Sequence, residues 1–125
     1  MKKAVCGILQ VGNRFVSVKR KDKESYGLIG GKVDQNETLE NAIIRETLEE
    51  TGFSVSINLW FNPFTEIDEN GYEVTTFLLN LNHGLHRQID VIKEVPIIYL
   101  LDKLQLINMS DFGEYNRKAF EHFNI

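Results

Sequence analysis

Three glutamates, Glu46, Glu49 and Glu50, stand together near the end of a helix predicted over residues 39–51. At about 100° per residue their side chains fall within one arc, so three carboxylates share one face. Like charges one turn apart destabilise a helix, and the negative end of the helix dipole also disfavours them. One neighbouring cation, Arg45, cannot neutralise three acids, whereas a divalent ion with oxygen ligands can. The cluster therefore indicates either a Mg²⁺ or Mn²⁺ site or a solvated acidic face, and periodicity does not separate the two.

A pair of glycines, Gly30 and Gly31, precedes this helix and closes a short strand predicted over residues 26–29. Because glycine has no Cβ, the backbone can approach a bound ion or a neighbouring side chain closely at this point. The glycine pair and the acidic helix together predict a crevice that is packed at one end and charged at the other.

The composition limits what else the chain can be. Its 125 residues are 42% hydrophobic and 26% charged, with a net charge of −4, which is ordinary for one globular domain over residues 1–125. An acidic chain is a poor non-specific binder of nucleic acid or of anionic membranes. No apolar run is long enough to span a membrane. The lone cysteine, Cys6, excludes an internal disulfide and favours a reducing, cytoplasmic location.

Alternating apolar runs and turn signals predict a mixed sheet with helices packed on its faces, an α/β fold. The expected strands cover residues 4–11, 14–19, 26–29, 53–67, 72–81 and 95–101. Asp68–Glu69–Asn70–Gly71 is a strong hairpin turn. The first helix is expected to begin after Thr38 and to stop at Gly52. A second helix is expected over residues 110–123, with Asp111 as its cap and Glu114 three residues on.

The segment from Gly31 to Phe53 resembles the Nudix box. Gly31 is followed after five residues by Glu37, and after seven more by the run Arg45 to Phe53. Thr47 is a mild departure at a position that is usually bulky and apolar, and it affects packing rather than chemistry. The resemblance implies the Nudix fold, an α/β/α sandwich around a mixed β-sheet. It also implies cleavage of a nucleoside diphosphate linked to another moiety, with Mg²⁺ or Mn²⁺ as cofactor.

The resemblance also assigns roles within the box. It implies that the metal is bound by the carboxylates of Glu46, Glu49 and Glu50 and by the backbone carbonyl of Gly30. Arg45 matches a residue that orients the acids by ion pairing. Glu37 matches an acid that steadies the loops around the helix.

The C-terminal third resembles MutT-like members of the family, through the pattern N-x-x-D-F-x-x-x-N from Asn108 to Asn116. In such enzymes the last asparagine recognises the purine edge, so Asn116 is the candidate here, and an ordinary polar residue opening a helix is the alternative. Glu94, after Lys93, matches a further metal ligand or the general base, and a solvated loop acid is equally compatible. Arg20 matches a phosphate-binding arginine, or else it is a surface cation in a basic run.

The activity expected from this resemblance is hydrolysis of a (deoxy)nucleoside triphosphate to the monophosphate and pyrophosphate. An oxidised purine such as 8-oxo-dGTP is one possible substrate. Two alternatives stay open: a Nudix hydrolase of ADP-ribose or of a dinucleotide, and a module that senses a nucleotide without turnover. The proline typical of the ADP-ribose type is missing, because Asp68 stands at its place. The expected partner is a small nucleotide, and the sequence leaves open a monomer or a homodimer.

Overall fold

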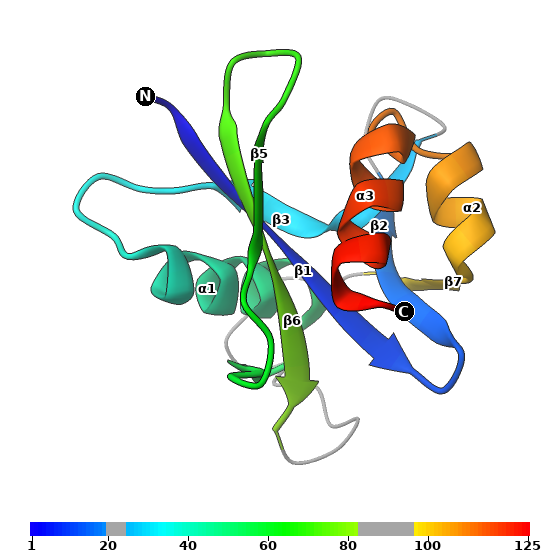
Figure 1. Cartoon of the computed structure of the whole chain (residues 1–125). Helices are drawn as coiled ribbons and strands as arrows, with labels where there is room; N and C mark the ends of the chain where they lie inside the picture. The colour runs from blue at the N-terminus through cyan, green and yellow to red at the C-terminus, as the bar shows by residue number, and fades with distance from the viewer. Residues whose placement is uncertain (20–24, 83–96) are drawn as a thin grey trace.

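The computed structural model describes residues 1–19, 25–82 and 97–125. Within them, seven strands form one mixed sheet in the order β4-β6-β1-β3-β2-β7, and β5 also pairs with β6 (Figure 1). β1 and β6 run parallel, and the other pairs are antiparallel. The strands are β1 (Lys3–Val11), β2 (Arg14–Lys19), β3 (Tyr26–Lys32), β4 (Val55–Ile57), β5 (Phe64–Ile67), β6 (Glu73–Leu81) and β7 (Tyr99–Leu101).

Helices cover both faces of the sheet. α1 (Leu39–Thr51) lies on one face, while α2 (Lys103–Asn108) and α3 (Gly113–Phe123) lie on the other. Each face has its own core: Ile43 of α1 packs in one cluster, and Phe120 of α3 in the other. The predicted α/β/α sandwich around a mixed sheet is therefore confirmed.

The first helix has the bounds that the sequence predicts. The Thr38 side chain accepts a hydrogen bond from the Asn41 N–H, which satisfies one of the free amides of the first turn. Gly52 ends the helix with φ of 77°, a left-handed conformation that glycine adopts without steric cost. Thr47 is fully buried and its hydroxyl donates to the Ile43 carbonyl at 2.6 Å, so the departure at this position is absorbed within the helix.

Three strand predictions need correction. β3 does not end before the glycine pair but continues through it to Lys32, because Gly30 and Gly31 pair with β1. Residues 53–67 do not form one strand: they hold the short β4 and β5, separated by a turn in which the Asn58 side chain accepts from the Trp60 N–H. Of the described residues in the last predicted strand, only Tyr99–Leu101 are extended in the sheet.

The C-terminal region differs more from expectation. α2 was not predicted; a capping box between Asp102 and Gln105 starts it. α3 begins at Gly113 and not at residue 110, and Phe112 is its N-cap, without a side-chain cap hydrogen bond. The predicted Asp111 cap is therefore wrong. Gly113 packs so tightly on α2 that a Cβ would lie 1.9 Å from the Ile107 carbonyl oxygen, so the packing of α2 decides where α3 starts.

Candidate active site

Arg45 lies at the centre of an ion-pair network at the surface of α1. Its guanidinium donates to both oxygens of Glu37, from Nε at 2.7 Å and from Nη2 at 2.9 Å. Nη1 donates to Glu46 at 2.9 Å and to Glu49 at 3.2 Å, and Nη2 also reaches the Lys32 carbonyl at 3.2 Å. The planar fork of arginine suits this set of acceptors, which a lysine could not satisfy together. The network ties α1 to β3 and to the loop between them.

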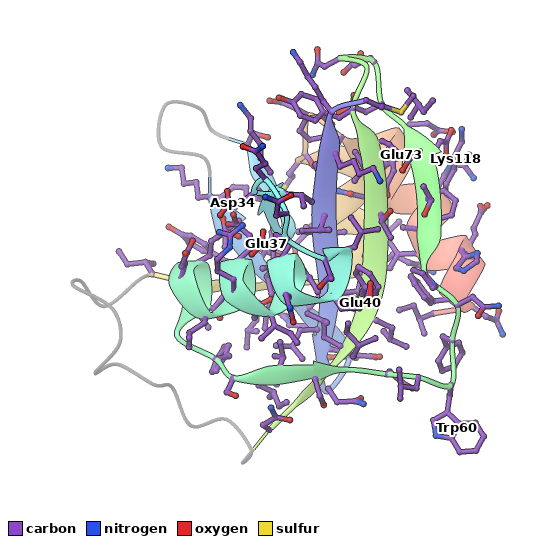
Figure 2. All side chains as sticks on the ribbon, turned by 90° about the vertical axis from the view of Figure 1, so that its left-hand side faces the viewer. Asp34, Glu37, Glu40, Trp60, Glu73 and Lys118 are labelled. Atoms are coloured by element: carbon purple, nitrogen blue, oxygen red, sulfur yellow. The ribbon has the colours of Figure 1, made fainter. Side chains whose placement is uncertain are left out.

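Glu37 holds that loop in place. Its Oε1 accepts from the Asp34 N–H at 3.0 Å, while both oxygens accept from Arg45. The hydrogen bond from Arg45 is the main reason why the pKa of Glu37 falls to about 2. Asp34 itself lies 3.5 Å from Arg45. Figure 2 shows both acidic side chains gathered beside α1.

Glu46 packs directly against the second glycine. A Cβ on Gly31 would lie 2.4 Å from the Glu46 carboxyl carbon, so only glycine fits there. Burial raises the pKa of Glu46, and the hydrogen bond from Arg45 partly opposes the rise. Gly31 is therefore required for the close contact between β3 and Glu46.

Glu50 reaches the first glycine. Its Oε1 accepts from the Gly30 N–H at 2.8 Å. Burial raises the pKa of Glu50 to about 7, and the charges of Glu46 and Glu49 add to this while the Gly30 N–H opposes it. No side chain fits at position 30, because a Cβ on Gly30 would lie 2.3 Å from the Val5 carbonyl oxygen.

A cleft of about 510 Å³ joins this end of α1 to the start of α3. Glu50 and the glycine pair line one part of it, and residues from the turn before α3 line another. The sheet between them supplies the floor. The principal lining side chains are Cys6, Lys32, Glu50, Asp68, Tyr72, Val74, Phe112, Tyr115 and Asn116.

Asn116 lies in this cleft on the first turn of α3 and is 3% exposed. Its Nδ2 donates to the Leu106 carbonyl of α2 at 2.9 Å. This bond fixes which end of the amide is the nitrogen. Because an amide nitrogen carries two N–H groups, one N–H and the Oδ1 acceptor remain for other partners.

Two of the residues singled out from the sequence, Arg20 and Glu94, lie outside the described residues. The structure brings Glu46, Glu49, Glu50, Gly30 and Arg45 together, and it places Asn116 in the same cleft as Glu50. Sequence reasoning missed Cys6 and Tyr115 on the cleft wall. The Tyr115 hydroxyl donates to the Val74 carbonyl at 3.1 Å and lies 2.7 Å from the Thr76 hydroxyl. Strand alternation was the available signal for Cys6 on β1, but it does not say which strands are neighbours, and nothing in the sequence indicated which face of α3 carries Tyr115.

The donor chemistry around Glu50 suits a hard divalent cation. The acids supply oxygen donors, and Glu50 has a pKa raised by burial, so a positive charge there would relieve an unfavourable ionisation. With the side chains as they stand, the described part of the chain has no group of three His, Cys, Asp or Glu residues that could hold a metal. Nη1 of Arg45 lies between Glu46 and Glu49, and Glu49 is 57% exposed and can rotate.

A family model described as the NUDIX domain matches residues 1–109. The chain belongs to the Nudix hydrolase family. Members of this family generally use a divalent metal and act on small nucleotide substrates. None of the helices in the described ranges is both long and apolar enough to cross a membrane.

Two curated relatives of this Nudix hydrolase carry different substrate names. An "ADP-ribose pyrophosphatase" of Methanocaldococcus jannaschii is 30% identical over 128 residues, a match covering 98% of this chain and 69% of the relative. A "Putative 8-oxo-dGTP diphosphatase" of Bacillus subtilis is 41% identical over 51 residues, which cover 41% of this chain and 34% of the relative. The comparisons therefore agree on the reaction class and differ on the substrate.

Solved structures agree on the fold of this Nudix hydrolase. A Nudix hydrolase from Nitrosomonas europaea superposes with a TM-score of 0.73 at 17% identity, covering 98% of this chain and 88% of that one. An Ap4A hydrolase from C. elegans also gives 0.73, at 23% identity and with 98% of both chains covered. At these identities the likeness concerns the fold alone.

Proposed function

We propose that this Nudix hydrolase cleaves a (deoxy)nucleoside triphosphate to the monophosphate and pyrophosphate, in a divalent-metal-dependent reaction. One observation carries the proposal: a single cleft contains Glu50 and the glycine pair of the box, and also the buried amide of Asn116. A nucleotide needs both, since its phosphates require a charged site and its base requires a polar reader in an enclosed pocket.

In this proposal Glu46, Glu49 and Glu50 hold Mg²⁺ or Mn²⁺ together with the Gly30 carbonyl oxygen. When bound, the ion would neutralise charge on the diphosphate and make the attacking water more acidic. Arg45 holds Glu46 and Glu49 close to the cleft, and Glu37 in turn holds Arg45. The proton of the water passes to a box glutamate or to Glu94, and Arg20 binds a phosphate of the substrate.

Asn116 is proposed to read the base. With one N–H bound to the Leu106 carbonyl, the amide has one donor and one acceptor left. The edge of 8-oxoguanine offers the complementary pair, an O6 acceptor and an N7–H donor. Normal guanine has a lone pair at N7, which would face the amide oxygen. A site that depends on such a hydrogen bond discriminates strongly against the analogue that lacks it.

ADP-ribose is the second candidate, because the relative of that name aligns along 98% of this chain. The absence of the proline typical of the ADP-ribose type, with Asp68 in its place, favours the triphosphate. The cytoplasm remains the proposed location on the basis of the single cysteine.

The test is a turnover screen with Mg²⁺ over NTPs, dNTPs, 8-oxo-dGTP, ADP-ribose and dinucleotides, followed by kcat/KM for the best substrates. We expect 8-oxo-dGTP to exceed dGTP, and Asn116→Ala to remove this preference while hydrolysis of simple dNTPs falls much less. Equal loss of both substrates in the variant would show that Asn116 is not the reader. Turnover of ADP-ribose alone would select the second candidate.

A further inference from the structure

Three neighbouring strands present their ends to one edge of the cleft. β1 lies between β3 and β6, and Ala4 of β1 is level with Lys32 on one side and with Val74 on the other. Lys2 and Tyr72 stand two residues before Ala4 and Val74, so the strand alternation places all five side chains on the same face of the sheet. Tyr72, Lys32, Ala4 and Val74 all line the cleft.

Two lysine ammonium groups lie near the ring of Tyr72. The Nζ of Lys2 lies 5.5 Å from the ring centroid, and the Nζ of Lys32 lies 5.8 Å from it. Both are within the range of a cation–π interaction.

The turn before β6 fixes the tyrosine. Asp68 Oδ1 accepts from the N–H of Asn70 and from that of Tyr72, both at 2.9 Å, and the Asp68 N–H donates to the Tyr72 carbonyl at 2.8 Å. The backbone of Tyr72 is therefore held at both its N–H and its carbonyl by Asp68, without any contribution from the two lysines.

These two cations differ from three other cations of the described chain. Arg45, Arg117 and Lys118 are each ion-paired with carboxylates. Among the described residues neither Lys2 nor Lys32 forms such a pair. Two positive charges gathered on one ring without a carboxylate partner repel each other, and an anion between them would remove that cost.

Lys32 lies within the box itself. It follows Gly30 by two residues on the same strand face, which is about 7 Å along β3. Gly30 in turn donates to Glu50. An anionic group at the lysines would thus lie next to a diphosphate bound at the box.

We propose that Lys2, Tyr72 and Lys32 form a phosphate subsite, which binds the part of a substrate that extends beyond the diphosphate at the box. This inference rests on the proposed function and names its substrate class more closely. A nucleoside triphosphate carries a further phosphate there, whereas ADP-ribose carries an uncharged sugar. The subsite therefore favours the triphosphate.

ATP and ADP-ribose are matched probes, because they share adenosine and a 5′-diphosphate and differ in the distal group. Affinities are measured by calorimetry with Ca²⁺, and kcat/KM is measured with Mg²⁺. Lys2→Gln is compared with Lys3→Gln, which removes the same charge from the opposite face of β1. We expect Lys2→Gln to weaken the binding of ATP about three- to five-fold, which corresponds to the free energy of a solvent-exposed ion pair. The affinity for ADP-ribose should change little, and Lys3→Gln should change the affinity for neither ligand.

A second pair of variants separates the ring from the charges. Tyr72→Phe keeps the aromatic face and should retain selectivity for ATP, whereas Tyr72→Leu should lose it without any change in net charge. The subsite is overturned if Lys2→Gln and Lys3→Gln act alike, or if Tyr72→Leu weakens ATP and ADP-ribose equally, as stacking of the ring on adenine would. If the turnover screen finds no nucleoside triphosphate that is hydrolysed, the proposed function fails, and the calorimetric difference between ATP and ADP-ribose still decides whether the subsite exists.

Discussion

Two helices of this protein each carry an arginine that forms ion pairs with two or more glutamates. On α1, Arg45 contacts Glu37, Glu46 and Glu49, and its side chain is 27% exposed. On α3, Arg117 contacts Glu114 and Glu121 and is 40% exposed. The α3 pairs are spaced three and four residues apart within one helix. The α1 network also reaches Glu37 and the Lys32 carbonyl, which lie outside the helix.

The difference lies in what each network connects. Exposed pairs within one helix contribute a few tenths of a kcal/mol each, because water screens them and the side chains lose entropy. A network that joins a helix, a loop and a strand holds tertiary geometry and is partly shielded from solvent. Similar ion-pair patterns on two helices therefore have different consequences, and the following experiments measure that difference.

Removal of divalent metal should have the largest effect. Excess EDTA is expected to abolish turnover, while Mg²⁺ or Mn²⁺ should raise the Tm, because a ligand that binds only the folded state stabilises it by mass action. Thermal unfolding and product release are measured with and without metal. The matched control is Glu114→Gln, in the α3 network, which should respond to metal as the wild type does. Full activity in EDTA would contradict the proposed mechanism.

The second largest effect is expected for Glu50→Gln. We expect kcat to fall by about 10²–10³-fold, the usual loss when one group that stabilises developing charge is removed. The fold should persist, since the amide oxygen can still accept from the Gly30 N–H. Without metal the Tm should be unchanged or slightly higher, because one acid leaves a repelling cluster. Steady-state kinetics and circular dichroism report both, and near-normal kcat would favour a solvated acidic face.

Arg45→Lys and Arg117→Lys compare the two networks directly. Lysine keeps the charge but cannot reproduce the arginine fork. Arg45→Lys is expected to cost about 2 kcal/mol of unfolding free energy, less than a fully buried pair because the network is partly exposed, and to lower kcat as well. Arg117→Lys should stay within about 0.5 kcal/mol. Urea unfolding measures both, and equal losses would remove the distinction between the two helices.

The smallest effect is expected in the pH dependence of stability. The folded pKa of Glu37 is about 2, below its value of 4.5 in the unfolded chain. Its stabilising contribution is therefore present above pH 4.5 and is lost as the pH falls through 2. Glu37→Gln should lower the Tm at neutral pH, and the difference from wild type should vanish near pH 2. Glu114→Gln should give a smaller difference, because the pairs of Glu114 lie within α3 alone.

The Nudix box could be predicted from the sequence because its determinants are local. Thr38 and Gly52 set the ends of α1 through contacts within a few residues. The spacing of Glu46, Glu49 and Glu50 places them on one face by helix geometry alone. The turn before β6 was predictable for the same reason. Asp68 accepts short-range hydrogen bonds within the turn, and Gly71 adopts a φ of 82°.

The rest of the cleft was decided by tertiary structure. Lys2, Tyr72 and Lys32 meet because β1 pairs with both β3 and β6, and strand alternation assigns a face without naming the neighbouring strand. The start of α3 and the orientation of Asn116 depend on α2, which supplies the Leu106 carbonyl ten residues away. Sequence patterns of period two or 3.6 describe one element at a time. The contacts that shape this cleft lie between elements, where only packing decides which side chains meet.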